Sequence, residues 1–555
     1  MIGIKIKSVS SLEKILPFQN FEEISETTVF YSLKNERINV QFIISNENNG
    51  DDARRDNLCF ISASGAHDYC SLRLVRNVIA DLPCYPWDES QGTPLFINSE
   101  NNVYPDILEE LDSGNRLNLL PGNNTVWLEY TPTVSGTETI IFSMDRGDEH
   151  ISKSITIYVS DSILPESDLI FTEWFHCDCL ATYYNVPVFS EKHWEIIKKY
   201  LSTAARNGIN CILTPVLTPP LDTEIGTYRP AVQLVDIKKT GNNFSFSFER
   251  LGRWISLCQS VGIRYFEISH LFTQWGAKYA PQVIAETENR TERIFGWDTP
   301  GTEGEYPSFL SCFLPELVNF LKDHNVLDRC RFHISDEPSG DEAIKNYAKA
   351  RKIVDPILKD CRIIDALSDI RFFRTGAADI PVPPVNHIEP FLNEEIDERW
   401  TYYCCSQFKK VSNRFIAYPS YRNRIIGIQM YKYDIKGFLQ WGYNFYYSMG
   451  SRRLINPFTC QSGDGKVPSG DPFSVYPSVK GTAIESIRLA VFYEAIQDYM
   501  ALKICEKIIG RENVIKIIDG TAGMNVTFTE YPQRAGYILE IREKINRIIE
   551  DKWEQ

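Results

Sequence analysis

The sequence predicts a multidomain β plus α/β protein, in which an N-terminal β-sandwich precedes a (β/α)8 TIM barrel with C-terminal helices. Short alternating apolar runs fill the chain up to about residue 162, and strands alternating with amphipathic helices follow from Leu169. A length of 555 residues is also more than one hydrophobic core usually needs. We therefore predict a β-sandwich accessory domain over residues 1–162 and a barrel catalytic domain over residues 163–555.

The first predicted domain consists of short strands separated by turns. The runs TTVFYSL, INVQFIIS, NTVWLEYTP, ETIIFSMD and SITIYVS alternate apolar and polar residues, and the turn-rich stretches NENNGDD, DSGN and PGNN lie between such runs. Strands at this spacing are typical of a β-sandwich. This part of the sequence contains no cluster of catalytic side chains.

The second predicted domain alternates strands with helices that end at glycine. EKHWEIIKKYLSTAARNG and ERLGRWISLCQSVG are amphipathic, and Gly208 and Gly262 are expected at their C′ positions. Eight strand–helix units fit a (β/α)8 barrel, with VNHIEP and WTYYCCS as the weakest strands. A doubly wound open sheet is the alternative, but the first strand ends in WFHCDCL rather than in a glycine-rich phosphate loop.

The charge and composition exclude several classes of partner. A formal net charge of −15 argues against a nucleic-acid backbone and an anionic lipid surface as partners. No stretch reaches the roughly 18 apolar residues that membrane insertion needs. The N-terminus MIGIKIKSVSSLEKILPFQNF lacks the apolar segment of a signal peptide, and the 14 cysteines have no disulfide spacing. We therefore expect reduced thiols and a cytoplasmic location.

The chemistry of a (β/α)8 barrel lies at the C-terminal ends of its strands. The third predicted strand ends near Gln274 and Trp275, and the fourth runs into Asp336 and Glu337. Pro338 predicts an extended backbone at Glu337 and an end to the strand ladder. The alternative interpretation is structural, because Asp336 or Ser339 could cap the helix that follows.

Adjacent carboxylates favour one form of glycosidic cleavage. The usual scheme places its two carboxylates on opposite sides of the sugar, about 5 Å or more apart. Neighbours in sequence fit a different division of work, in which Glu337 is the general acid and then the base. Asp336 would orient a 2-acetamido group on the substrate, whose carbonyl oxygen attacks the anomeric carbon in place of an enzyme nucleophile.

At these residues the chain resembles glycoside hydrolase family 123, the β-N-acetylgalactosaminidases. The resemblance covers roughly residues 165 to 505 and extends over several motifs in order. His387 in VNHIEP replaces a more usual acidic residue, and the closing helix VFYEAIQDYM lacks an Arg and a Gly that relatives tend to carry. The other similar segments are RFHISDEPSG, WTYYCCS, RNRIIGIQMYKYDIKGFLQWGYNFYY, GDPFSVYPS and ESIRLAVFYEAIQDYMAL.

The resemblance implies a retaining exo-hydrolase that releases terminal β-linked N-acetylgalactosamine from glycans of the glycosphingolipid type by substrate-assisted catalysis. It implies Asp336 as the stabiliser, Glu337 as the acid/base and Tyr402 as a hydrogen-bond partner of the acetamide. It also implies Trp441 as the hydrophobic wall of the subsite.

Three more residues are candidates for substrate binding by their position at the rim. His176 follows the first strand, Asn444 follows Trp441, and Asp471 lies with Tyr476 in a long loop rich in glycine and proline. For His176 a packing role is an equal alternative. The long loop either covers the subsite or is surface filler.

We expect neither metal nor cofactor. The run from His176 to Cys179 offers imidazole and thiolate ligands, but no second cluster has ligand spacing. The expected partner is a glycan with a terminal β-linked N-acetylgalactosamine, and a homo-oligomer is one expected assembly. No G-x-S-x-G elbow supports an esterase.

Three other functions stay open at this point. One is a β-N-acetylhexosaminidase of broader preference, similar to family 20. Another is a non-catalytic carbohydrate-binding barrel protein. The third is a structural role in which the sandwich mediates assembly.

Overall fold

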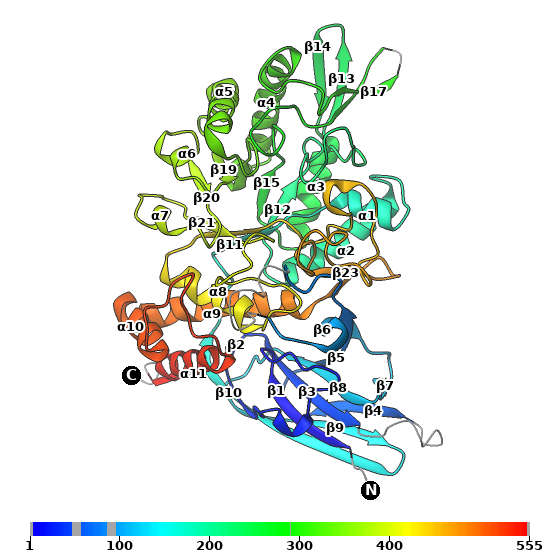
Figure 1. Cartoon of the computed structure of the whole chain (residues 1–555), viewed down its shortest axis with the longest axis vertical. Helices are drawn as coiled ribbons and strands as arrows, with labels where there is room; N and C mark the ends of the chain where they lie inside the picture. The colour runs from blue at the N-terminus through cyan, green and yellow to red at the C-terminus, as the bar shows by residue number, and fades with distance from the viewer. Residues whose placement is uncertain (1–3, 47–56, 86–95, 289, 552–555) are drawn as a thin grey trace.

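A computed structural model describes residues 4–46, 57–85, 96–288 and 290–551. The sandwich strands gather at one end of the molecule and the parallel sheet with its helices at the other, with helix α9 (Ile487–Ile509) between them (Figure 1). The last sandwich strand ends at Ile163 and the first strand of the parallel sheet begins at Ile170.

Two five-stranded sheets pack face to face in the N-terminal part. The rings of Phe42 and Phe142, one from each sheet, stack with centroids 4.4 Å apart in a fully buried core. Side chains alternate between the two faces of a strand, so the alternating sequence buries one face of each sheet. One sheet has the order β1 (Lys5–Ser10), β3 (Ile38–Asn46), β8 (Gly122–Tyr130), β5 (Cys70–Ile79) and β6 (Val103–Glu110). The other has the order β2 (Val29–Lys34), β10 (Glu149–Ile163), β9 (Gly136–Arg146), β4 (Leu58–Ser64) and β7 (Arg116–Asn118).

Eight parallel strands form the sheet of the second part. Their order is β20-β19-β18-β15-β12-β11-β22-β21, so each strand lies beside its neighbours in sequence and β11 lies beside β22. Two residues beyond the end of the outermost strand β20, Pro384 forms an isolated parallel bridge with Tyr402 at the end of the other outermost strand, β21. The strands are β11 (Ile170–Glu173), β12 (Cys211–Thr214), β15 (Tyr265–Ile268), β18 (Cys330–Phe332), β19 (Arg362–Ala366), β20 (Ile380–Val382), β21 (Trp400–Tyr402) and β22 (Gly437–Gln440).

The sequence prediction for the sixth strand is wrong. VNHIEP is not a strand: β20 is Ile380–Val382, and Glu389–Leu392 forms the short helix α7. The segment 380–385 contains three prolines, which cannot donate to a strand ladder and so hide the strand. The Pro383 carbonyl still accepts from the Tyr402 amide at 3.2 Å, which keeps the backbone paired here.

A helix follows each strand of the parallel sheet. Gly208 has φ +82° and Gly262 has φ +99°, so both predicted C′ positions are confirmed. At the first, the Ile209 amide reaches back to the Ala204 carbonyl at 3.1 Å, as in a Schellman motif. The helices are α1 (Cys177–Tyr183), α2 (Glu191–Arg206), α3 (Glu249–Ser260), α4 (Glu305–Asp323), α5 (Gly340–Leu358), α6 (Arg371–Arg374), α7, α8 (Tyr421–Lys432) and α9. Helices α10 (Arg511–Ala522) and α11 (Ala535–Asp551) end the described chain.

Short hairpins lie in three segments that each connect a strand of the parallel sheet to the helix after it. Strands β13 (Asp236–Thr240) and β14 (Asn243–Ser247) precede α3, and β16 (Val283–Glu286) and β17 (Thr291–Phe295) precede α4. Strands β23 (Val475–Pro477) and β24 (Ala483–Glu485) precede α9.

A buried ion pair and buried hydrogen bonds join the sandwich to helix α9. Arg488 on α9 donates to both oxygens of Asp106 on β6, at 2.8 and 2.9 Å. Glu494, also on α9, accepts from Ser11 at 2.7 Å and from Asn39 at 2.8 Å. Within the described residues, none of the helices has the length and apolar content that crossing a membrane requires.

Candidate active site

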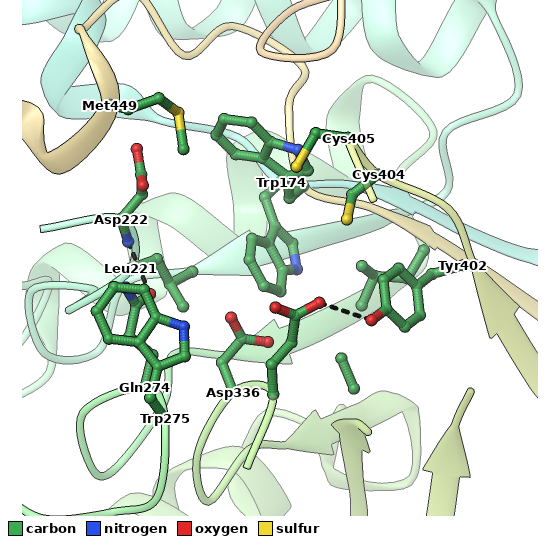
Figure 2. A pocket seen from close by; sticks show the side chains of 14 residues that line it. Trp174, Leu221, Asp222, Gln274, Trp275, Asp336, Tyr402, Cys404, Cys405 and Met449 are labelled. Atoms are coloured by element: carbon green, nitrogen blue, oxygen red, sulfur yellow. Dashed lines mark hydrogen bonds between the residues drawn. The ribbon is translucent and has the colours of Figure 1, made fainter. Parts of the chain in front are cut away.

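One pocket opens at the C-terminal ends of the parallel strands and contains the predicted carboxylate pair (Figure 2). Its empty volume is about 650 Å³, a figure that includes open solvent at the mouth. The residues that line it are Trp174, Leu221, Asp222, Gln274, Trp275, Asp336, Glu337, Ala366, Tyr402, Cys404, Cys405, Leu439, Trp441 and Met449.

The backbone turns sharply at the carboxylate pair. Glu337 has φ +42°, so the extended geometry predicted from Pro338 is wrong. Its amide donates to the Ala366 carbonyl on β19 at 3.0 Å, which fixes the turn although this φ is unfavourable for a side chain with a Cβ. Helix α5 begins three residues later with Ser339 at its N-cap, so Asp336 does not cap it. Both carboxylates therefore line the pocket despite being adjacent in sequence.

Tyr402 connects the end of β21 to Glu337. Its hydroxyl donates to Glu337 Oε1 at 2.6 Å, which is short and typical of a hydrogen bond to a carboxylate (Figure 2). Burial, and after it the Glu337 charge, raises the pKa of Tyr402 well above its usual range. The phenol therefore stays protonated and orients the Glu337 carboxylate.

The buried surroundings of Asp336 shift its pKa strongly. Burial first and the Glu337 charge second raise its pKa well above the usual value, while the charge of His333 opposes them. A negative charge on Asp336 is costly in this buried site beside a second carboxylate, so the protonated form of Asp336 is favoured.

A buried polar network lies beneath the pair. His333 contacts Glu267 Oε1 through Nε2 at 2.6 Å and Asp365 Oδ1 through Nδ1 at 3.2 Å. The two carboxylates raise the pKa of His333 to about 10, although its burial alone would lower it. Asp365 also accepts the Ile334 amide at 3.1 Å, two residues before Asp336. The network thus holds the strand end that leads into the pair.

Among the described residues, the group best suited to a metal ion is His270, His333 and Asp365, with ligand atoms within 4.8 Å of one another. The two imidazole rings stack at 4.2 Å with only 19° between their planes. Both nitrogens of His333 already contact carboxylates, so this geometry fits a hydrogen-bonded support better than a metal centre.

Trp441 and Asp471 act together. Trp441 lines the pocket and its indole Nε1 donates to Asp471 Oδ2 at 2.9 Å. Asp471 is fully buried behind it, and burial raises its pKa to about 7. The loop that carries Asp471 is fixed from the sandwich side, where the Ser469 amide donates to the Leu82 carbonyl at 2.7 Å.

The structure places His176 and Asn444 beside each other but not on the pocket lining. The amide of His176 donates to Asn444 Oδ1 at 2.9 Å, and Asn444 Nδ2 donates back to the His176 carbonyl at 3.1 Å. The His176 ring contacts the Trp441 carbonyl at 3.0 Å and Arg229, which pairs with Asp178. These residues support the backbone on which Trp441 is mounted.

Sequence reasoning placed Gln274 and Trp275 at the rim without a role, and it missed Asp222 and Trp174. Trp174 donates from Nε1 to Glu267 Oε1 at 2.7 Å and so joins the pocket to the buried network. Asp222 lies eight residues beyond the end of β12, where the strand pattern gives no signal.

Two comparisons with known proteins find the same family. The profile of the glycoside hydrolase 123 catalytic domain matches residues 174–505. A family 123 glycoside hydrolase from Clostridium perfringens, studied for glycolipid glycan hydrolysis, is 15% identical with a TM-score of 0.74. The alignment covers 100% of this chain and 99% of that one.

More distant structures carry no weight. A β-glucuronidase from Parabacteroides merdae is 12% identical, with a TM-score of 0.28 over 84% of this chain and 51% of that one. A putative β-galactosidase from Bacteroides fragilis is 10% identical, with a TM-score of 0.29 over 79% of this chain and 55% of that one. A comparison with curated proteins finds no match. The family profile covers more than half of the sequence and includes the whole pocket, and on this ground the chain belongs to glycoside hydrolase family 123.

Proposed function

We propose that the protein is a retaining exo-β-N-acetylgalactosaminidase that releases terminal β-linked N-acetylgalactosamine from glycans of the glycosphingolipid type. The observation that carries the proposal is the adjacent pair Asp336 and Glu337 in one pocket, with Tyr402 donating to Glu337. The family membership and the glycolipid substrate named for the Clostridium perfringens relative support it.

In the first step Glu337 gives its proton to the glycosidic oxygen as the bond to the anomeric carbon breaks. The acetamide carbonyl oxygen of the substrate forms the new bond to that carbon and gives a cyclic oxazolinium. Asp336 carries the negative charge while Glu337 holds the proton; it accepts the substrate amide N–H and stabilises the positive charge. Tyr402 keeps the Glu337 carboxyl oriented, and its burial favours proton transfer to the substrate over exchange with water.

In the second step Glu337 takes a proton from water, whose oxygen attacks the anomeric carbon. The bond to the acetamide oxygen breaks and the amide is restored. Two displacements at one carbon retain its configuration. Trp441, held by Asp471, is suited to pack against the acetamide methyl group.

The test is hydrolysis of an aryl β-N-acetylgalactosaminide, followed by NMR to identify the anomer released first. We expect the β-anomer from the wild-type protein and loss of nearly all activity in Glu337→Gln. The exposed Glu316→Gln on α4 is the matched control and should retain wild-type activity. A protein inert on both galacto- and gluco-configured substrates would contradict the proposal, and equal rates on the two would favour a broader hexosaminidase.

We also propose that the parallel sheet is a closed (β/α)8 barrel, which is supported by the bridge from Pro384 to Tyr402. A cytoplasmic location stays a prediction. A homo-oligomeric assembly stays a prediction.

A further inference from the structure

A polar group that the proposed mechanism leaves unused lies in the same pocket. Asp222, Gln274 and Trp275 line it together with the catalytic pair. Figure 2 shows these side chains on one side of Asp336 and Tyr402 on the other. Tyr402 hydrogen-bonds Glu337, the proposed general acid, on one side of the pocket. The three unused residues lie on the opposite side (Figure 2).

Two atoms of this group are buried without a hydrogen-bond partner. Gln274 Oε1 accepts the Asp222 amide at 2.8 Å, but Gln274 Nε2 has no partner among the described residues. Asp222 Oδ2 likewise has none, while the Gly450 amide bonds the same carboxylate. Gln274 is only 5% exposed and lines the pocket, so bulk water does not satisfy its donor. Leaving a buried donor and acceptor unpaired is costly, which indicates that a ligand completes them.

The backbone around the group is held in an unfavourable conformation. Asp222 has φ +45°, and Trp275, Gly276 and Ala277 have φ of +63°, +119° and +56°. The Trp275 amide donates to the Asp336 carbonyl at 2.8 Å, which ties this loop to the catalytic turn. Strained non-glycine residues that the surroundings enforce are typical of ligand sites. Trp275 lines the pocket and is 59% exposed, so its ring is accessible to a ligand.

We propose that Asp222 and Gln274 bind the hydroxyls at C3 and C4 of the terminal acetamido sugar, with Trp275 against its apolar face, and that they select between galacto and gluco configuration. This assignment rests on the proposed function. Glu337 fixes the position of C1 and Asp336 that of the acetamido group on C2, so C3 and C4 extend to the far side of Asp336. An unpaired donor and an unpaired acceptor among the residues that line one side of the pocket match two neighbouring hydroxyls, each of which can donate and accept.

The experiment compares Asp222→Asn and Gln274→Glu with the wild-type protein. Gln274→Glu keeps the Oε1 acceptor for the Asp222 amide and replaces the free donor by a carboxyl oxygen. Glu224→Gln is the matched control, because Glu224 lies on the same loop but forms an exposed ion pair with Arg452 at 2.6 Å. kcat/KM is measured on aryl β-N-acetylgalactosaminide and on its gluco epimer, and binding of free N-acetylgalactosamine and of its 4-deoxy analogue is measured by calorimetry.

We expect each pocket variant to lower kcat/KM on the galacto substrate by roughly 10- to 100-fold, with a smaller loss on the gluco epimer. The wild-type protein should bind the 4-deoxy analogue more weakly than the parent sugar, and the variants should bind both equally. Glu224→Gln should keep the wild-type ratio.

The outcomes separate this inference from the proposed function. Hydrolysis with an unchanged epimer ratio in both pocket variants would overturn the inference and leave the function standing. Sugar binding that depends on Asp222 and Gln274, but without turnover, would uphold the inference and overturn the function. Absence of binding and turnover in the wild-type protein would overturn both.

Discussion

At Asp336 burial and then the Glu337 charge raise the pKa most, and His333 only partly opposes them. An ionised Asp336 in this buried site therefore costs folding free energy, which under the proposed function a substrate amide would recover on binding. Active sites commonly trade stability for function in this way. The two predictions at this scale follow from the sign of that shift.

Asp336→Asn should raise the melting temperature at pH 7.5. The folded pKa lies above the unfolded value of 3.8, so protonation stabilises the fold fully below that pH, and this stabilisation is lost as pH rises through the folded pKa. The neutral amide does not suffer this loss, so its advantage should shrink as pH falls towards 4. Melting curves from pH 4.5 to 8 measure it, with the exposed Asp323→Asn as control. An advantage independent of pH would contradict the argument.

The pH dependence of kcat/KM should be bell-shaped, because the pair works with one proton and fails with two or none. Since burial raises the pKa of Asp336, the acid limb should lie above the range of an ordinary aspartate. Initial rates on an aryl substrate between pH 3.5 and 9 measure both limbs. A flat profile over that range would exclude a shared proton.

At the scale of the element, two adjacent tyrosines at the end of β21 have different roles: one contacts the proposed acid/base and the next packs in the core. Tyr402 points to Glu337, while the next residue, Tyr403, is fully buried and donates to Asn423 Oδ1 at 3.0 Å on α8. Alternation along an extended backbone sends the two rings in opposite directions. Substitution of Tyr403 is therefore a matched control for substitution of Tyr402.

Tyr402→Phe should lower kcat by roughly 10- to 100-fold with little change in KM, because a hydrogen bond to a charged group is lost from the acid/base and not from substrate binding. Tyr403→Phe should lower the melting temperature and leave kcat unchanged. Steady-state kinetics and melting curves on both variants measure the two effects. Equal kinetic losses in both would indicate a general disturbance of the strand.

The sequence sufficed for elements whose pattern is local and regular. The alternating sandwich runs and the helices that end at Gly208 and Gly262 are read from neighbouring residues alone. Strand β20 was missed because Pro381 and the prolines after it suppress the strand pattern, and only pairing with distant strands reveals it. The same holds for the hairpin β13–β14, which belongs to a connection between strands.

In the site, the carboxylate pair was predictable because Asp336 and Glu337 are consecutive in the sequence. The positive φ of Glu337 was not, since the bond from its amide to Ala366 comes from another strand. Asp222 gave no signal for the same reason: its importance depends on Gln274, 52 residues away. A role that depends on a residue far away in the sequence can be recognised only from the structure. The boundary between the two predicted domains stays a prediction.

At the scale of the whole molecule, the sandwich and the parallel sheet share charged groups that neither part could bury alone. Arg488 is 2% exposed and Asp106 is fully buried, and Tyr476 also donates to Asp106 at 2.6 Å. Breaking a buried pair is more costly than replacing it, because the remaining charge has no partner.

Arg488→Met should destabilise the protein by about 3–5 kcal/mol, since it leaves the Asp106 carboxylate buried without its guanidinium. The double variant Asp106→Asn with Arg488→Met should recover a large part of that loss. Chemical denaturation of the wild type, both single variants and the double variant completes the cycle. Additive effects would show that the two groups do not act as a pair.

The position of Asp81 has a practical consequence for anyone who wishes to shorten this chain. Its carboxylate accepts from the Gln461 amide at 2.9 Å and from the Ser469 hydroxyl at 3.0 Å, so an N-terminal residue secures the loop that ends at Asp471 and the indole it holds. A gene fragment starting at residue 164 would discard this anchor together with the partners of Arg488 and Glu494. Its product should accumulate in inclusion bodies rather than as a minimal enzyme.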